Sequence, residues 1–306
     1  MSRRNRSKAS AFWQSVLARL GIGVLWALHW LPNRVLARVG AGLGALLHLT
    51  ARSRRHIVNV NLRLCFPDRS EHERRELAKA HFRALGRSLV DRALLWWAPT
   101  DRVRQLVRVQ GEEKLRALVD AGKPVILLAP HFVGLDAGGA GVAMRFDSLS
   151  VYARQKNPVI DRWVYHGRKR FGDQMLLSRD DGVRSTVKAM KSGRPFYYLP
   201  DMDFRARDSI FVPFFGNPAA TITGLSRLSR LAGAAVVSCA TRMLPDGEGY
   251  VVEIGDPWPD FPTADVEGDT RRMNEWIESL VLTMPEQYYW VHRRFKTRPP
   301  GERKPY

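Results

Sequence analysis

The 306-residue chain is poor in cysteine and in acidic side chains. Its two cysteines, Cys65 and Cys239, are too few for a disulfide scaffold or a cysteine-rich zinc site, which excludes the small disulfide-stapled secreted class. The 30 Asp and Glu residues face 49 Lys and Arg residues, so the formal net charge is +19. Because 45% of the residues are hydrophobic and 10% are aromatic, intrinsic disorder is excluded as well. The chain therefore folds, and its surface suits a polyanionic partner.

The chain also lacks internal repeats and the known signatures of nucleic-acid binding, such as a zinc finger or a helix-turn-helix. Residues 1–100 hold 18 Lys and Arg against 5 Asp and Glu, a net +13, and tryptophan-rich apolar segments alternate with these basic clusters. An anionic membrane surface attracts this pattern, since each basic residue near it contributes about 1 kcal/mol. We therefore expect an anionic membrane, and no nucleic acid, as the partner of this region. An ordinary pair of buried helices with solvated flanks is the alternative.

The first apolar segment, residues 11–31, follows a basic tip at residues 1–8. It is about as long as the roughly 20 apolar residues that cross a bilayer as a helix, and the residues after it make a poor secretory cleavage site. Arg19 near its middle costs about 2.5 to 3.5 kcal/mol in hydrocarbon. Two alternatives therefore stay open, a transmembrane helix with a cytoplasmic N-terminus and a helix in the plane of the membrane. With the second apolar stretch, 35–49, this predicts membrane-anchoring helices over residues 1–50.

Beyond residue 100, buried-strand patterns alternate with helical periodicity, which predicts an α/β fold whose sheet is flanked by helices. The predicted strands are 124–128, 149–152, 196–199, 210–214, 235–241 and 249–254. The predicted helices are 71–97, 113–121, 134–144, 158–170, 183–191, 223–232 and 270–284. We expect one domain over residues 51–300 and a polar tail at 301–306.

A histidine and an aspartate follow the strand predicted at 124–128. Ligands of open α/β sheets bind at the carboxyl ends of strands, and His131 stands just beyond such an end. Asp136 is five residues later, about 140° away on an ideal helix, so the two side chains meet only if His131 lies in the loop and Asp136 in the first turn of the next helix. A carboxylate on one imidazole nitrogen would leave the other free to accept a hydroxyl proton. We predict a catalytic dyad with His131 as general base; a capped loop histidine beside a surface carboxylate is the alternative.

Several blocks of sequence between about residues 50 and 300 form a recognisable set. They are NLRLCFP at 61–67, APHFVGLD at 129–136, Asn157-Pro158 with Asp161, GRKR at 167–170, LPDMD at 199–203, FVPFFG at 211–216, ATITG at 220–224 and PEQYYWVHRRFKTRP at 285–299. This set resembles the late acyltransferases of lipid A biosynthesis, the lauroyl/myristoyl transferase family. That family belongs to the glycerolipid-acyltransferase superfamily, which shares the His-x-x-x-x-Asp/Glu motif. Many members of the family have Glu where this chain has the shorter Asp136.

The resemblance implies a mixed sheet of the glycerolipid-acyltransferase type and a location at the cytoplasmic face of the inner membrane. It also implies transfer of a fatty acyl group from acyl carrier protein to a hydroxyl of a phosphorylated glucosamine lipid. We expect no cofactor and no metal. His131 would remove the hydroxyl proton and Asp136 would stabilise the imidazolium. Two alternatives remain: a glycerophospholipid or ornithine-lipid acyltransferase with the same dyad, and a non-catalytic basic membrane adaptor.

Other side chains in these blocks are candidates for substrate binding. Arginines bind phosphate and acidic sugars bidentately, and Arg168, Arg170 or backbone amides near Gly134 could also stabilise an oxyanion. Asp201 and Asp203 are expected to pair with such arginines, a metal site being the alternative. The candidates are Arg154, Asn157, Asp161, Arg168, Arg170, Asp201, Asp203, Thr221, Thr223, Arg293 and Arg294. The segment that contains Thr221 and Thr223 reads equally well as core.

Overall fold

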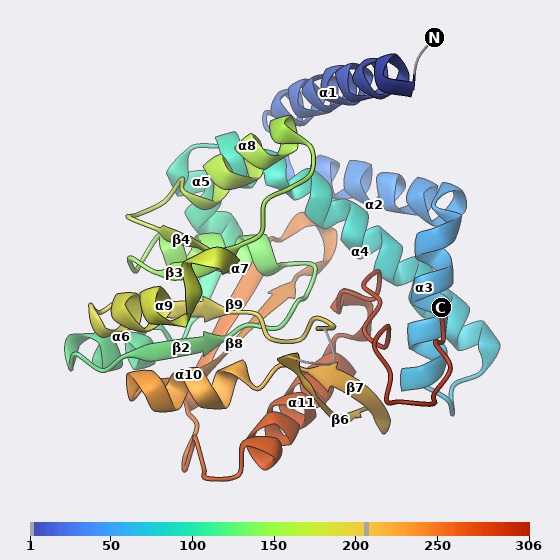
Figure 1. The fold of residues 1–306 in the computed structure, drawn as a ribbon. Coiled ribbons are helices and arrows are strands. Elements are labelled where there is room, and N and C mark those ends of the chain that lie inside the picture. The colour runs from blue at the N-terminus through green and yellow to red at the C-terminus, as the bar shows by residue number, and fades with distance from the viewer. Residues whose placement is uncertain (1–2, 205–207) are drawn as a thin grey trace.

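A seven-stranded sheet lies at the centre of the computed structural model, which describes residues 3–204 and 208–306 (Figure 1). Of residues 3–12 and of Arg179 the structure describes the backbone but not the side chains. The side chains of the basic tip at residues 1–8, which are expected to bind the membrane, therefore lie outside the description. In spatial order the strands are β1 (Val107–Gln110), β9 (Tyr250–Pro257), β8 (Ala235–Met243), β2 (Val125–Leu128), β5 (Phe196–Tyr198), β3 (Leu149–Tyr152) and β4 (Met175–Ser178). All neighbours are parallel except β8 and β9, which are antiparallel. The predicted mixed sheet is confirmed.

The central strand β2 separates two hydrophobic cores. All four of its residues are buried, as its continuous apolar run predicts for a strand covered on both faces. Ile126 and Leu128 point into one core, and Val125 and Leu127 point into the other, because successive side chains of a strand alternate between faces. The loop after Leu128 is therefore held between two packed layers.

Helices cover both faces of the sheet (Figure 1). The core around Ile126 includes side chains of α3 (Arg52–Cys65), α9 (Gly182–Lys191), α10 (Gly224–Ala232) and α11 (Val266–Thr283). The core around Leu127 includes side chains of α2 (Asn33–Thr50), α5 (Thr100–Leu106), α6 (Glu112–Asp120) and α7 (Leu135–Ala143), with α8 (Pro158–Arg168) packed against it. The long helix α4 (Glu71–Trp97) contributes to both cores.

Helix α4 begins and packs as its sequence dictates. Ser70 accepts a hydrogen bond from the backbone N–H of Glu73, whose side chain accepts one from the Ser70 N–H, and this capping box starts the helix at the predicted residue.

Helix α2 packs against α4 at very short range. A Cβ at Gly40 would lie 2.5 Å from the Cα of Arg87, and one at Gly86 would lie 2.3 Å from the backbone nitrogen of Gly44. Gly40 and Gly44 of the second apolar stretch therefore serve close helix packing.

The first helix, α1 (Arg3–Leu28), lies at the top of Figure 1, above α2 and α8. It contacts α4 and α8, and the side chain of Asn157 at the start of α8 donates to the Gln14 carbonyl at 3.3 Å. Within residues 3–204 and 208–306, no helix is long and apolar enough to cross a membrane.

The remaining elements frame the loop that follows β2. Strands β6 (Ile210–Phe214) and β7 (Asn217–Thr221) form an antiparallel hairpin, and positive φ angles at Phe215 and Gly216 close its turn. Short 3-10 turns lie at η1 (Arg179–Asp181), η3 (Pro245–Gly247) and η4 (Pro285–Gln287). After η4 the chain passes beside Phe132, which forms an isolated antiparallel bridge with Tyr288.

Candidate active site

His131 lies in the loop between β2 and α7 and contacts one carboxylate, that of Asp201. Its ring Nδ1 is 2.7 Å from Asp201 Oδ1, and its backbone N–H donates to both Asp201 oxygens at 3.1 and 3.0 Å. Asp201 follows β5, the strand beside β2, so the two residues meet where parallel neighbouring strands end. Asp201 is 1% exposed, whereas the His131 side chain keeps 18% of its surface accessible.

Burial raises the pKa of Asp201, but the charge of His131 and the hydrogen bonds from its ring and backbone outweigh burial, with Arg294 adding to them, and lower that pKa below its usual value. The carboxylate is therefore ionised and accepts the Nδ1 proton. The other ring nitrogen, Nε2, is then the one that can accept a proton from outside.

The segment after η4 holds the His131 loop in place. The Tyr289 N–H donates to the His131 carbonyl at 2.9 Å, and the Val133 N–H donates to the Gln287 carbonyl at 2.8 Å. The ring of Tyr289 lies beside the imidazole, with 6.4 Å between the ring centres. The block 285–299, singled out from the sequence, is thus the support of the histidine loop.

Asp136 lies in the first turn of α7, as expected, but its contacts differ from the predicted dyad. Its Oδ2 accepts from Arg92 Nε at 2.8 Å and lies 2.7 Å from Arg92 Nη2, and its Oδ1 accepts from Arg168 Nη2 at 3.3 Å. Among the described residues, the carboxylate on the His131 ring is Asp201 and not Asp136. Asp136 lies five residues after His131 and faces α4 and α8, whose Arg92 and Arg168 guanidinium groups bind its carboxylate. The catalytic roles of His131 and Asp136 stay predictions.

Burial raises the pKa of Asp136, but the positive charges and hydrogen bonds of Arg92 and Arg168 outweigh it and lower the pKa to about 2. The carboxylate is therefore ionised throughout the neutral range.

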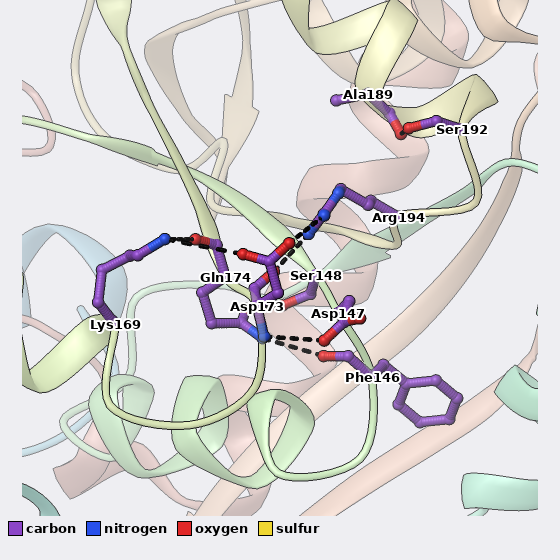
Figure 2. A network of polar contacts seen from close by, with 9 residues as sticks. All are labelled: Phe146, Asp147, Ser148, Lys169, Asp173, Gln174, Ala189, Ser192 and Arg194. Carbon is purple, nitrogen blue, oxygen red and sulfur yellow. Dashed lines mark hydrogen bonds and ion pairs between the residues drawn. The ribbon is translucent and has the colours of Figure 1, made fainter.

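The C-terminal end of α8, which carries Arg168, is fixed from two sides. A Cβ at Gly167 would lie 2.1 Å from Trp96 Nε1, so only glycine lets α8 approach α4 this closely. Residues 169–174 are tied down by the polar network in Figure 2. Within it, Gln174 donates from Nε2 to the Phe146 carbonyl at 3.0 Å, and Asp173 forms an ion pair with Arg194.

A small pocket of about 60 Å³ lies next to Asp136 and Arg168, the two charged residues in its lining. Its other lining residues come mainly from α4, α7, α8, β3 and β4 and are largely apolar. They are Leu95, Trp96, Leu135, Gly139, Ala140, Ala143, Ser148, Ser150, Val151, Val164, Gly167, Phe171, Gln174, Leu176, Tyr197 and Leu199.

Several predicted substrate-binding residues have structural partners instead. Arg170 donates to the carbonyl groups of Leu94, Leu95 and Ala98 and so satisfies the end of α4. Arg294 is 1% exposed and donates to the Ala220 carbonyl and to Thr221 Oγ1. These contacts turn both guanidinium groups inward in the structure.

The acidic and hydroxyl side chains among the candidates also contact other protein groups or are buried. Among the described residues, the expected pairing of Asp201 and Asp203 with arginines is not observed. Asp201 contacts His131, and Asp203 accepts from the Thr297 N–H and hydroxyl. Thr221 and Thr223 are buried. Within the described part of the chain, no group of three or more His, Cys, Asp or Glu side chains could hold a metal ion.

The remaining predicted substrate-binding residues lie near the start of α8 or are exposed arginines. Asn157 caps α8 by accepting from Val159 N–H at 2.9 Å, and Asp161 accepts from the Tyr152 hydroxyl and from Gln155 N–H. Arg154 and Arg293 are exposed. Outside the His131–Asp201 pair, two further side-chain contacts join candidate residues in the described part of the chain: Arg168 with Asp136, and the buried Arg294 with Thr221.

Comparisons with known proteins find relatives that match nearly the whole chain. The family model described as bacterial lipid A biosynthesis acyltransferase matches residues 3–297. The chain belongs to this family. It is 38% identical over 286 residues to the lipid A biosynthesis lauroyltransferase of Escherichia coli K12, with 93% of each chain covered. It is 34% identical to the palmitoleoyltransferase of the same organism (94% and 93% covered) and 33% identical to its myristoyltransferase (96% and 89% covered). The predicted family and the prediction of an acyltransferase are confirmed.

Two features of this lipid A biosynthesis acyltransferase were missed from its sequence. Asp201 was assigned to arginine pairing. The available signal was its position just after the predicted strand 196–199, since ligand-binding residues gather at the carboxyl ends of strands in such sheets, but the sequence does not say which strands are neighbours. Arg92 was not singled out, because nothing in the periodicity of residues 71–97 marks one basic residue as facing a site 44 positions away.

Proposed function

We propose that this family member is a membrane-associated O-acyltransferase that moves a fatty acyl chain from acyl carrier protein to a hydroxyl of a phosphorylated glucosamine lipid, a precursor of lipid A. The family supports the acyl transfer and the lipid A pathway. The observation that carries the chemistry is the contact of His131 Nδ1 with the buried carboxylate of Asp201 at 2.7 Å, which leaves Nε2 available as a base.

In the proposed reaction, His131 Nε2 takes the proton of the acceptor hydroxyl while the oxygen attacks the thioester carbonyl. Asp201 keeps the ring in the correct tautomer and stabilises the imidazolium that forms. The tetrahedral intermediate then collapses, the carbon–sulfur bond breaks, and the thiolate takes the proton from the imidazolium. The products are the new ester and the free thiol of the carrier.

A covalent acyl-cysteine intermediate has no support in the structure. Both cysteines are buried, and burial raises the pKa of the Cys239 thiol to about 12. A thiol in such surroundings is inert as a nucleophile. Direct attack by the acceptor hydroxyl is therefore the proposed route.

We place the part of the donor's acyl chain next to the thioester in the apolar pocket beside Asp136, because a pocket of about 60 Å³ is too small for the whole chain. The small side chains of Gly139, Ala140 and Ala143 on α7 form part of its wall. An elongated hydrocarbon chain suits such a lining, since each buried CH₂ contributes about 0.8 kcal/mol.

We also propose that α1 and α2 bind the cytoplasmic face of the inner membrane in the plane of the bilayer. Each helix exposes large apolar side chains at three-, four- or seven-residue spacing along one face. They are Trp13, Leu17, Leu20 and Val24 on α1 and Val35, Val39, Leu46 and Leu49 on α2. An apolar stripe with basic residues nearby is typical of helices that lie in a membrane interface.

The transfer is tested with purified protein, an acyl carrier protein thioester, and either a lipid A precursor or lysophosphatidate as acceptor. The expected result is a new ester on the lipid A precursor, detected by mass spectrometry. In cells that lack the protein, lipid A should lose the mass of one secondary acyl chain, and that mass gives the chain length. Acylation of lysophosphatidate alone, with unchanged lipid A in these cells, would contradict the proposal.

The membrane surface is tested by the double substitution Leu17→Asp and Leu20→Asp on α1. Two charges on the apolar stripe should reduce the fraction of protein that floats with anionic vesicles. Leu282→Asp on α11 is the matched control, because Leu282 is similarly exposed but lies on a helix remote from α1 (Figure 1). Equal flotation of both variants would show that α1 is not the membrane-binding face.

A further inference from the structure

One carboxylate and two guanidinium groups meet beside the His131 loop, each from a different helix. Asp136 comes from α7, Arg92 from α4 and Arg168 from α8. The Asp136 side chain is 16% exposed, and the two arginine side chains are 27% and 33% exposed. The cluster is therefore largely shielded from water, but both guanidinium groups keep some accessible surface.

The hydrogen-bond donors of this cluster exceed its acceptors. A guanidinium has five N–H groups. Arg92 directs Nε and Nη2 at Asp136, and Arg168 directs Nη2 at Asp136; within the described residues no other hydrogen-bond acceptor is in range of either side chain. Most of the N–H groups are thus left to bind an oxygen that enters the site.

The charges of the cluster do not cancel. Two cations share one anion, so the site carries a net +1. Asp91, the residue before Arg92, pairs with Arg87 at 3.4 Å, so its charge is already balanced by another guanidinium. Asp136 lies in the first turn of α7, whose N-terminal dipole adds a further positive potential.

The cluster lies close to the His131 loop. Asp136 is five residues after His131, in the first turn of the helix into which that loop leads. Helix α4, which carries Arg92, packs against both α7 and η4. Tyr289, two residues after η4, donates its N–H to the His131 carbonyl at 2.9 Å.

We propose that Arg92 and Arg168 form a binding site for one anionic oxygen, and that Asp136 is the positioning residue that holds the two guanidinium groups together. The assignment rests on the proposed acyl transfer and gives Asp136 a role other than orienting His131. The anionic oxygen has two possible sources: the oxyanion of the tetrahedral intermediate, or a phosphate of the acceptor lipid.

The test substitutes Arg92→Lys and Arg168→Lys, which keep the charge and remove the planar fork. Arg75→Lys is the matched control, because Arg75 also lies on α4 and pairs with a carboxylate, Glu71, but is 58% exposed. Three rates are measured for each protein: transfer to the phosphorylated acceptor, transfer to the dephosphorylated acceptor, and thioester hydrolysis without acceptor. The expected result is a loss of at least about tenfold for transfer to the phosphorylated acceptor at Arg92 and Arg168, against little change at Arg75.

The three rates separate the two sources. If the oxygen is the oxyanion, kcat falls and thioester hydrolysis falls with it, whichever acceptor is used. If it is a phosphate, the KM of the phosphorylated acceptor rises, the loss disappears with the dephosphorylated acceptor, and hydrolysis is unchanged. Either outcome supports the site. Because hydrolysis needs no acceptor, it still reports on Arg92 if the wild-type enzyme proves to use another lipid, so a failure of the proposed function is distinguishable.

Chemical rescue by added guanidinium distinguishes an anion-binding site from an ion cluster that only holds the three helices together. Arg92→Ala leaves a space, and added guanidinium should restore part of the lost rate, whereas added ammonium should not. Thermal unfolding is followed in parallel. Losses at Arg92 and Arg168 no larger than at Arg75 would overturn the proposal, and so would losses that follow the unfolded fraction alone with no rescue.

Discussion

The two aspartates beside the β2–α7 connection have different partners, and the partners decide what each carboxylate can do. Asp201 contacts an imidazole, whose proton can move, whereas Asp136 contacts two guanidinium groups, whose protons do not leave at any physiological pH. The same functional group is thus suited to control a proton at one position and to organise positive charge at the other. A His-x-x-x-x-Asp spacing does not by itself say which of these an aspartate does.

The largest predicted loss of acyl transfer follows from removing His131, the proposed general base. His131→Ala should lower acyl transfer by about 10²- to 10⁴-fold, because the hydroxyl proton loses its acceptor. The measurement is turnover of purified enzyme with an acyl carrier protein thioester. His72→Ala, an exposed histidine on α4, is the control and should retain activity. Turnover near the wild-type value in His131→Ala would remove the imidazole from the mechanism.

The next effect distinguishes the two aspartates. Asp201→Asn should lose nearly as much activity as His131→Ala, because the ring loses the carboxylate that fixes its tautomer. The two changes together should lose little more than either alone, whereas the loss in Asp136→Asn should add to that in His131→Ala. Double-mutant cycles on kcat/KM give the answer. Strong coupling of His131 to Asp136, with none to Asp201, would restore Asp136 as the histidine partner.

A smaller effect is the coupling within each cluster. Asp136→Asn and Arg168→Lys should be strongly non-additive in transition-state free energy, with a coupling of about 0.5 to 3 kcal/mol, because they belong to one ion cluster. Asp136→Asn and Asp201→Asn should combine nearly additively. A double-mutant cycle on kcat/KM measures both couplings. Strong coupling between the two aspartates would mean that they form one unit.

The smallest predicted effect concerns stability in acid. The pKa of Asp136 is about 2 in the folded chain, below its unfolded value, so its contribution to stability is complete above about pH 4 and is lost as the pH falls toward 2. The loss should amount to about 2 kcal/mol. Denaturant unfolding between pH 5 and 2.5 measures it, and the wild type should lose more stability over this range than Asp136→Asn. Parallel curves for the two proteins would show that the arginine contacts do not hold in solution.

The regular elements were predictable wherever the sequence pattern is long or strongly bounded. The capping box at Ser70 and Glu73 fixes the start of α4, and the apolar run of β2 predicts a strand buried on both faces. The short strands β1 and β4, the helix α5, and the proline-containing β7 were not predicted. Four to seven residues carry little periodicity, and these segments lack the fully apolar run that identifies the equally short β2. The basic start of α3 likewise hid a helix whose buried side is formed by Ile57, Val58 and Leu62.

The sequence by itself determined the fold class, the family, and the position of His131 at the end of a buried strand, since local patterns and family motifs carry that information. The tertiary structure decided the partners. Asp201 reaches His131 because β5 lies beside β2, and Arg92 reaches Asp136 because α4 crosses α7, contacts that join residues 70 and 44 positions apart. Such contacts depend on the order of strands and the packing of helices, and a spacing of five residues along the chain cannot encode them.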